Sequence, residues 1–423
     1  MDFGSIIKEQ REELERIAKD GIIKRESQEK AKQFLKHPNI LAILGPRRCG
    51  KSILSYLLAR EDSFGYVNFD DERIADIKAE DLNKILQSFY ELYGEVKYIV
   101  LDEIQNINKW ELFVNRLRRT KRVIVTGSNS NLLSGELTTH ITGRYIHINL
   151  FPFSFREYLD LKQFNKAKAY STKENAQIIN FLKAYLELGG FPETDKFGKA
   201  MVSRIYEDIL TKDVLLRYKI KKFAELKKLA KYLVTNFCDE ISYSRLVSLT
   251  DAKHISTISN WISYLENSFL ILKLERFSFK LRQQFIAPKK IYCIDTGIVN
   301  AIGFKFSENR GKFMENCVAI ELQRQKSLED GIEIYYWKDH QQNEVDFVVK
   351  KGKDIQQLIQ VTCISNKLEL KEREIKSLYK ASKELKCKNL VVITWDYESE
   401  EKFDNKKVKY VPLWKYLIQE FSL

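Results

Sequence analysis

The sequence lacks the features that would assign it to a membrane, to a secretory route or to the small domains held by metals or disulfides. No apolar run reaches the roughly 18 to 20 residues that a membrane-spanning helix needs. Residues 1–30 are dense in charge and contain no apolar signal core, so no export address is predicted. The six cysteines lie far apart without a C-x-x-C pair, which indicates neither a zinc site nor a disulfide framework. We therefore expect a cytoplasmic protein without a membrane contact, whose cysteines are mostly small core residues.

Positive charge is the main bias of the composition. The chain has 423 residues, a length that favours two to three domains, and its formal net charge is +13. Such an excess would attract nucleic acid or an acidic protein surface through long-range fields. Lysine-rich surfaces also occur for solubility or heat tolerance, so charge alone leaves the partner open.

Short β-rich segments between residues 39 and 150 alternate with helix-length segments. The β-rich segments are ILAIL (40–44), GYVNFD (65–70), KYIVLD (97–102), RVIVTGS (122–128) and YIHINL (145–150). This alternation predicts a parallel sheet with helices on both faces, which places the chain in the α/β class. Together with a charged helix expected before it, with little core of its own, this part makes a first domain over residues 1–150.

The rest of the chain changes pattern three times. Residues 151–222 look helical and are interrupted by LGGFPE at 188–193, a turn signal with two glycines and a proline. Residues 223–309 give short helical patterns followed by a β-like hairpin, FLILKLERFSFKL at 269–281. Residues 310–423 give a helix, three strands, a charged helix and a further strand. We expect three further domains here, of which the last is a second α/β unit.

Residues 45–52 match the pattern G-x-x-x-x-G-K-[ST], between an apolar strand and an apolar-periodic helix. Glycines let backbone N–H groups curl around phosphate oxygens, and the helix N-terminus adds partial positive charge. Lys51 can then reach the β- and γ-phosphates, and the Ser52 hydroxyl can coordinate magnesium. We therefore predict an ATP-binding loop formed by Gly45, Pro46, Arg47, Arg48, Cys49, Gly50, Lys51, Ser52 and Ile53.

A second motif, KYIVLDEIQ at 97–105, is a strand that ends in two carboxylates. Asp102 is expected to hold the magnesium shell, and Glu103 to act as the general base that orients or polarises the attacking water. The motif falls one strand beyond GYVNFD, which suits an ATPase sheet with a strand inserted between the strands of Lys51 and Asp102. The two motifs together predict a Mg²⁺-dependent ATP site.

Three polar residues near this site have two interpretations each. Ser128 and Asn129 follow the strand RVIVTGS, where a polar group could sense the γ-phosphate or could cap a helix. Arg144 could neutralise transferred charge, for example on a neighbouring subunit, or could be a surface arginine before a strand. The candidate catalytic residues are therefore Lys51, Glu103, Ser128, Asn129 and Arg144.

The motifs together resemble a known family. The series GPRRCGKS, YVNFDDERI, YIVLDEIQN, VTGSNSNLLSGE, TGRYIHINLFPFSFREYL and ELGGFPE resembles the archaeal and bacterial AAA-type ATPases of the MNS/STAND-related kind. The later blocks NWISYLENSFLILKLERFS, KKIYCIDTGI and YYWKDHQQNEVDFVV are similar to the C-terminal region that accompanies those ATPases. The resemblance implies a RecA-like P-loop core over 1–150, a helical lid over 151–222, a winged-helix domain over 223–309 and a restriction-endonuclease-like α/β domain over 310–423.

The segment 241–269 indicates two helices joined by a short polar turn, as in a helix-turn-helix. The first turns of the second helix carry Ser256, Thr257, Ser259 and Asn260. Its expected buried stripe is Ile255, Ile258, Ile262 and Leu265. The hairpin after it would carry a basic wing, formed by Arg276, Lys280, Arg282, Lys289 and Lys290. Such a wing could contact the phosphates of duplex DNA, or the winged helix could only connect domains.

The last region matches the site of the PD-(D/E)XK nucleases in part. Glu315 lies on the expected helix, Asp346 shares one face of a strand with Glu344, and Gln360 and Thr362 share a face of the next strand. In those nucleases a helix Glu, a strand Asp and a Glu or Gln bind magnesium, and a lysine two residues later handles the nucleophilic water. Thr362 stands where that lysine is expected and carries no charge. We therefore expect a degenerate site with poor or absent hydrolysis, unless Lys367 or a charged residue of the helix expected over 369–386 reaches in.

The sequence as a whole predicts a multi-domain ATPase whose nucleotide state repositions the later domains. ATP and Mg²⁺ are the expected cofactors. Hydrolysis is expected to be slow unless a partner or a neighbouring subunit of a homo-oligomer donates an arginine, a group that contributes ~10³-fold or more in rate. Three roles stay open: a switch acting on DNA, an ATP-gated nuclease, and a signalling scaffold with an acidic protein partner.

Overall fold

The computed structural model of the chain describes residues 2–19, 21–133, 143–165, 170–303, 309–366, 372–403 and 406–419. It divides into two compact units, of which the first comprises Met1–Phe151 with Asn267–Phe269, and the second Pro152–Glu266 with Leu270–Leu423. The first unit thus ends one residue beyond the end expected from the sequence for the first domain. No helix among the described residues is both long and apolar enough to cross a bilayer.

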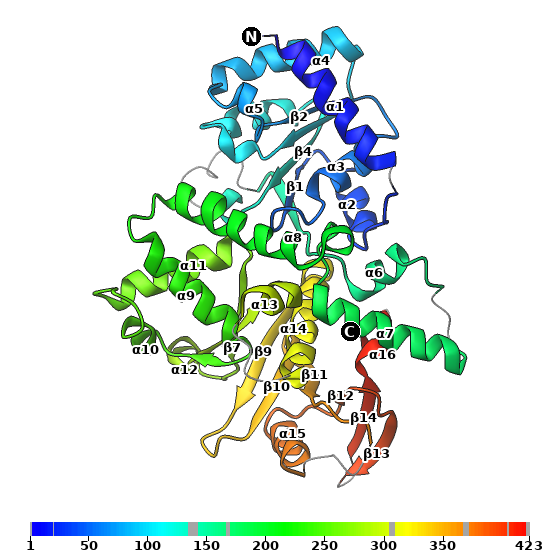
Figure 1. The fold of residues 1–423 in the computed structure, drawn as a ribbon, viewed down its shortest axis with the longest axis vertical. Helices are drawn as coiled ribbons and strands as arrows, with labels where there is room; N and C mark the ends of the chain where they lie inside the picture. The colour runs from blue at the N-terminus through cyan, green and yellow to red at the C-terminus, as the bar shows by residue number, and fades with distance from the viewer. Residues whose placement is uncertain are drawn as a thin grey trace. The chain divides into compact units, whose positions relative to one another are not determined.

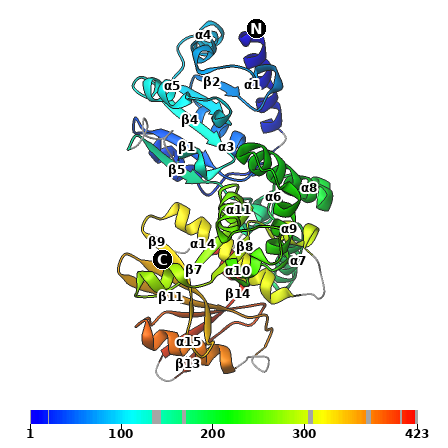
Figure 2. The ribbon, with the colours of Figure 1, turned by 90° about the vertical axis from the view of Figure 1, so that its left-hand side faces the viewer.

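The first unit is built on a parallel sheet in the order β2-β3-β4-β1-β5. Its strands are β1 (Ile40–Leu44), β2 (Phe64–Asn68), β3 (Tyr98–Asp102), β4 (Arg122–Gly127) and β5 (Tyr145–Asn149). Each strand falls on one of the β-rich segments of the sequence, and all of the pairings are parallel. β4 lies between β1 and β3, so the inserted strand predicted from the motif order is confirmed. Figure 2 shows β5 beside β1.

Helices of the first unit pack on this sheet and on one another (Figure 1). They are α1 (Phe3–Lys19), α2 (Gln28–Phe34), α3 (Lys51–Ala59), α4 (Leu82–Tyr93) and α5 (Trp110–Leu117), with 3₁₀ turns at Glu72–Ile74, Ala79–Asp81, Ile104–Asn106 and Ser130–Leu133. The expectation that the first charged helix has little core of its own was wrong. α1 buries Ile6, Ile7 and Leu14 and packs against α4, β2 and α3.

The second unit contains a sheet in the order β13-β14-β12-β11-β10-β9-β7-β8-β6. Its strands are β6 (Glu240–Ile241), β7 (Ile271–Arg276), β8 (Lys289–Cys293), β9 (Ile332–Lys338), β10 (Glu344–Lys351), β11 (Asp354–Val361), β12 (Leu390–Thr394), β13 (Ser399–Phe403) and β14 (Lys406–Pro412). β7 pairs with β9 through Glu275 opposite Tyr335. The sheet therefore runs across the expected domain boundary at 309/310, and residues on both sides of it belong to one unit.

Helices of the second unit precede, interrupt and cover this sheet. They are α6 (Phe155–Leu161), α7 (Thr172–Leu188), α8 (Thr194–Asp208), a π-helix (Ile209–Leu216), α9 (Phe223–Thr235), α10 (Tyr243–Val247), α11 (Ile255–Asn267), α12 (Leu281–Ile286), α13 (Thr296–Ile302), α14 (Arg310–Leu328), α15 (Glu372–Glu384) and α16 (Leu413–Ile418). α14 packs against β8 and β9, and α15 against β10 and β11. Neighbouring residues of β10 point to opposite faces, so Val345 joins the core under α15 while Asp346 points to the face of α14.

The LGGFPE turn is held by Asp295, the N-cap residue of α13. Its carboxylate accepts the N–H of Gly190 at 2.7 Å and the N–H of Gly297 at 2.8 Å. Gly189 has a φ of +79°, and a Cβ placed on it would lie 1.8 Å from Asp295 Oδ1. Glycine is therefore required at this position by both the backbone conformation and the close approach. Burial raises the pKa of Asp295 to about 6.

Candidate nucleotide-binding site

Loop 45–52 joins β1 to α3 with a backbone that only glycine permits at two positions. A Cβ on Gly45 would lie 2.1 Å from the carbonyl oxygen of Leu150. Gly50 caps α3 with a φ of +97°, in the left-handed region that side chains rarely adopt. α3 begins at Lys51, so the helix predicted to follow the loop is confirmed. The first turn of α3 therefore presents its backbone N–H groups at the end of a tightly curled loop.

Arg25 supports this loop and was missed by the sequence analysis. Its guanidinium is buried and donates to the carbonyl of Cys49 at 2.7 Å and to that of Phe151 at 2.6 Å. The arginine thus ties the loop to the segment that follows β5. Cys49 itself is buried, as expected for a small core residue.

Lys51 forms a buried ion pair with Glu103. Its ammonium donates to the carbonyls of Gly45 at 3.2 Å and Pro46 at 3.1 Å, and it lies 3.2 Å from a carboxylate oxygen of Glu103. Burial favours the neutral acid, but the charges of Lys51 and Arg47 outweigh burial and lower the pKa of Glu103 to about 2. Glu103 is therefore ionised at neutral pH, which is the protonation state that a general base needs.

Asp102 is the last residue of β3, and its carboxylate accepts hydrogen bonds from hydroxyl groups on three elements. Tyr66 Oη of β2 donates to it at 2.8 Å, Thr126 Oγ1 of β4 donates to its other oxygen, and Ser52 of α3 hydrogen-bonds to the same carboxylate. Burial, with the neighbouring charge of Glu103, raises the pKa of Asp102, and the three hydroxyl groups oppose that change. Ser52 and Asp102, predicted as magnesium ligands, are therefore brought together.

Gln105 adds an unused acceptor beside the acid pair. Its amide nitrogen donates to Glu103 Oε2, whereas its Oε1 is buried and accepts no hydrogen bond from the described residues. Neither Gln105 nor Thr126 was singled out from the sequence. For Thr126, the only signal in the sequence is that it lies in the next predicted strand after the strand of Asp102.

The remaining predicted catalytic residues separate into two groups. Ser128 and Asn129 follow β4 at the carboxyl edge of the sheet, where the loop after β1 also lies, and both are fully buried. Arg144 is exposed and precedes β5, which begins opposite Ile40 at the start of β1. Because β1 and β5 are parallel, Arg144 lies at the amino edge of the sheet and does not line the loop of its own chain.

The other residues around loop 45–52 have structural partners. Arg47 pairs with Asp70 at 2.9 Å, and Asp71 caps a 3₁₀ turn by accepting the N–H of Arg73 at 3.0 Å. Ile53 is half-buried on the first turn of α3.

The region expected as a winged helix keeps its two helices but not its hairpin. β7 pairs with β8, the segment 277–280 forms no strand, and α12 begins at Leu281, where the hairpin was expected to end. Ile258, Ile262 and Leu265 are buried as predicted. Ile255 is 53 % exposed at the first position of α11, so the prediction of burial was wrong for this residue.

The five residues of the expected basic wing do not share one exposed surface. Lys280 and Arg282 are exposed, whereas Arg276 is partly buried and donates to the carbonyl of Lys338. Lys289 and Lys290 are both buried, because they lie on β8 in the interior of the sheet. The prediction of a solvent-exposed wing was therefore wrong for these two lysines.

Three of the four predicted nuclease-site residues come together. Asp346 accepts the side-chain amide of Gln360 at 2.7 Å, and Lys290 lies 2.9 Å from Glu315 and 3.5 Å from Asp346. Thr362 is buried just after β11, where its N–H donates to the carbonyl of Ile393.

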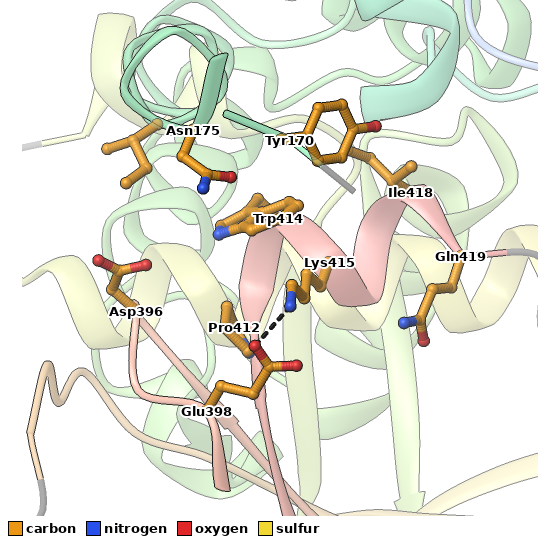
Figure 3. Close-up of a pocket in the computed structure, with 10 residues that line it drawn as sticks. Tyr170, Asn175, Asp396, Glu398, Pro412, Trp414, Lys415, Ile418 and Gln419 are labelled. Carbon is orange, nitrogen blue, oxygen red and sulfur yellow. Dashed lines mark hydrogen bonds and ion pairs between the residues drawn. The ribbon is translucent and has the colours of Figure 1, made fainter. Parts of the chain in front are cut away.

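A pocket of about 710 Å³ in the second unit contains none of the predicted site residues (Figure 3). Tyr170, Asn175 of α7 and Trp414 of α16 line it, and Lys415 forms an ion pair with Glu398 at its wall. The indole nitrogen of Trp414 is buried and has no hydrogen-bond partner among the described residues. No glycine-rich loop contributes to this pocket, so its chemistry differs from that of loop 45–52.

Three family models match successive parts of the chain. Residues 37–159 match the family described as an AAA domain. Residues 179–309 and 310–416 match two domains of unknown function, DUF8612 and DUF4143. The AAA match covers β1 to β5 and therefore loop 45–52, Asp102 and Glu103.

The chain is also similar to curated relatives and to solved structures. The uncharacterized protein MJ1544 of Methanocaldococcus jannaschii is 35 % identical over 401 residues, which cover 90 % of this chain and 88 % of that protein. An uncharacterized protein of Haemophilus influenzae is 29 % identical over 76 % of this chain and 82 % of its own length. The structure of the Walker-type ATPase PABY2304 of Pyrococcus abyssi covers 66 % of this chain and 96 % of its own, with 17 % identity and a TM-score of 0.45. The chain belongs to the family of MJ1544, and its first unit carries an AAA-type ATPase domain.

Proposed function

We propose that the chain binds ATP in loop 45–52 and hydrolyses it with the help of Mg²⁺. The observation that carries this proposal is the convergence of Lys51, Ser52, Asp102 and Glu103 at one edge of the first sheet. These residues come from two motifs separated by some fifty positions of sequence, and each has the chemistry that its proposed role needs.

The backbone around loop 45–52 supports an anion as the ligand. Gly45 leaves no space for a side chain against Leu150, and Gly50 places the N-terminus of α3 at the end of the loop. A helix N-terminus combines free N–H groups with partial positive charge, which favours a phosphate. Lys51 adds a full charge at the same place.

The magnesium ion of such a site would be held by Ser52 and Asp102, and it would neutralise charge on the phosphates when bound. The residues fit this role, because a hydroxyl and a carboxylate are hard oxygen ligands and already lie in contact. The unpartnered Oε1 of Gln105 gives the same corner a further acceptor, suited to a water molecule.

Glu103 is proposed to orient the attacking water and to accept its proton. The charge of Lys51 keeps the carboxylate ionised, and Gln105 holds one of its oxygens. The backbone of Glu103 has a φ of +52°, and its N–H is fixed by Thr126. Arg144 could act only on the site of another copy. ATP hydrolysis without a partner is therefore proposed to be slow.

Hydrolysis is tested by phosphate release from ATP with the full chain. We expect turnover that requires Mg²⁺ and is lost on chelation. Asp102→Asn should lower turnover strongly, whereas the matched variant Asp62→Asn removes a carboxylate paired with Lys97 at the surface and should change nothing. Turnover that is unaffected by chelation or by Asp102→Asn would contradict the proposed metal site.

The proposed partner is duplex DNA, which the net charge of +13 and the helices α10 and α11 support. An acidic protein is the second candidate. It is favoured by the side chains of Phe279, Leu281, Phe285 and Ile286, each at least 67 % exposed, beside the exposed Lys280 and Arg282. Salt-titrated binding to a DNA duplex separates the two, because phosphate contacts make affinity fall linearly on a log–log plot. A slope near zero would leave the protein partner.

A further inference from the structure

Lys290 of β8 lies among three carboxylates in the second unit. Its Nζ is 2.6 Å from Glu344 Oε1, 2.9 Å from Glu315 Oε1 and 3.5 Å from Asp346 Oδ1. The three acids come from α14 and β10, while the lysine comes from β8, so three elements meet at this ammonium. The lysine side chain is only 4 % exposed. A buried charge cluster of this kind is stable only if its charges are paired.

The oxygens of these carboxylates have further donors. Tyr292 Oη donates to Glu315 at 2.8 Å, and Asp346 Oδ2 accepts the side chain of Gln360 at 2.7 Å and the N–H of Val361 at 2.8 Å. Glu344 also lies 3.3 Å from Lys338 Nζ. One polar atom at the rim is unused, because Gln360 Oε1 is buried and has no partner among the described residues.

The resemblance of this region to restriction-type nucleases implies a divalent ion held by Glu315, Asp346 and Gln360. The residues do not fit such an ion. A magnesium ion needs carboxylate oxygens at roughly 2.0 to 2.1 Å, whereas here Glu315 and Asp346 face the Lys290 ammonium, and Gln360 turns its amide nitrogen toward Asp346. No set of three His, Cys, Asp or Glu side chains suited to a metal occurs in the part of the chain that the structure describes.

We propose that Lys290 is the resident cation of this cluster and takes the place of a divalent ion, which makes the cluster a metal-independent joint between β8, β10 and α14. The lysine is covalently part of the fold, so it cannot be lost to a chelator or exchanged. It also crosses the boundary at 309/310, because Lys290 precedes it and all three acids follow it.

The electrostatic balance supports this role. Burial alone would lower the pKa of Lys290, but Glu315 and the other negative groups around it outweigh burial and raise the pKa well above its usual value. The ammonium therefore carries its charge at neutral pH. A divalent ion that entered the cluster would have to displace this ammonium or lie against it, and like charges at such a separation repel strongly.

The test compares Mn²⁺ binding by full-length wild type and Lys290→Met in the absence of nucleotide, by electron paramagnetic resonance and calorimetry. Lys290→Met should gain one Mn²⁺ site per chain, bound about 10- to 100-fold more tightly than any site of the wild type, the range by which groups beside a metal change its affinity. Lys312→Met, which removes a lysine paired with the single carboxylate of Asp239, should gain none. Adding Asp346→Asn to Lys290→Met should abolish the gained site.

A folded Lys290→Met protein that gains no Mn²⁺ site would overturn the proposal. If this variant is unfolded without metal, recovery of its melting transition on addition of Mn²⁺ supports the proposal. If it does not recover, the wild type is measured instead. A stoichiometric Mn²⁺ site in the wild type that Asp346→Asn removes would overturn the proposal, as would Mg²⁺-dependent cleavage of a plasmid that Asp346→Asn removes. The absence of both in the wild type supports the proposal. None of these measurements uses the ATP site.

Discussion

Thr126 donates its hydroxyl hydrogen bond to Asp102 and accepts the backbone N–H of Glu103 at 3.0 Å. One side chain of β4 thus fixes both members of the acid pair at the end of the neighbouring strand. The carboxylate of Asp102 and the backbone that aims Glu103 cannot shift independently while this contact persists. The inserted strand of the sheet therefore has a direct role in the geometry of the nucleotide site.

Thr126→Val should lower ATP turnover by about 10- to 100-fold, since a small misplacement of reacting groups has effects of this size. Valine has the same shape but leaves the N–H of Glu103 buried without an acceptor, which costs about 1–3 kcal/mol. Steady-state phosphate release measures the effect. Thr126→Ser keeps the hydroxyl and should retain most of the activity, and equal losses in both variants would argue against the role of the hydroxyl.

Glu103→Gln should keep nucleotide binding and lower turnover by about 10²- to 10⁴-fold, the contribution usual for a positioned general base. The amide fills the same space but cannot accept a proton. Fluorescent-nucleotide titration and single-turnover hydrolysis separate the two effects. Normal hydrolysis by this variant would show that the base is another group.

Lys51→Ala should abolish measurable nucleotide binding, because it removes the only full charge that α3 places at loop 45–52. It also leaves Glu103 buried beside one fewer cation, so the pKa of Glu103 should rise from its value of about 2. Titration with a fluorescent ATP analogue is the measurement. Lys97→Ala removes an exposed lysine paired with Asp62 and should bind like the wild type.

Arg25→Met should raise the Kd for nucleotide by about 10-fold or more, since hydrogen bonds from a charged group contribute about 1.5–3 kcal/mol and hold loop 45–52 in shape. Arg25→Lys should be intermediate, because an ammonium cannot span the carbonyls of Cys49 and Phe151 as a guanidinium does. Arg16→Met, on the exposed face of α1, is the control. Unchanged affinity in Arg25→Met would remove the loop-holding role.

Asp295 should make the second unit less stable as pH rises. Its folded pKa of about 6 lies above the ordinary 3.8, so the folded state binds the extra proton between these values. The stabilising contribution is full below pH 3.8 and is lost as pH rises through 6, in total about 3 kcal/mol. Urea unfolding from pH 4 to 7 measures it.

Asp295→Asn is the comparison for that titration. The amide carries no titrating proton, so the stability of this variant should not follow the titration, and the wild type should gain about 3 kcal/mol relative to it as pH falls from 7 to below 3.8. Parallel pH profiles would assign the titration to another group.

The sequence was sufficient for the sheet of the first unit because its signals are local. Each strand is a short apolar run, and the order of motifs suited a sheet with one strand inserted between β1 and β3, which the structure identifies as β4. Lys51, Ser52, Asp102 and Glu103 could be proposed as site residues in the same way, since each lies within a motif whose spacing carries the chemistry.

The parts that the sequence did not reveal depend on contacts between distant residues. Arg25 reaches Phe151 across 126 positions, and Thr126 meets Asp102 across 24. From the sequence, Lys290 was expected in an exposed basic wing. The carboxylates that pair with it lie 25 to 56 positions further along the chain, so the sequence around Lys290 did not indicate its burial. Burial of a charge is decided by its partner, and a single sequence does not state which partner that is.

The pairing of β7 with β9 has a consequence for how this chain can be divided. A protein cut between residues 309 and 310 would have an unprotected strand edge on each fragment, with unpaired N–H and C=O groups that invite aggregation. Truncation at that point should give insoluble pieces, and co-expression of both pieces should restore a soluble complex. The two matched domains that meet there share one sheet, so we expect them to fold together.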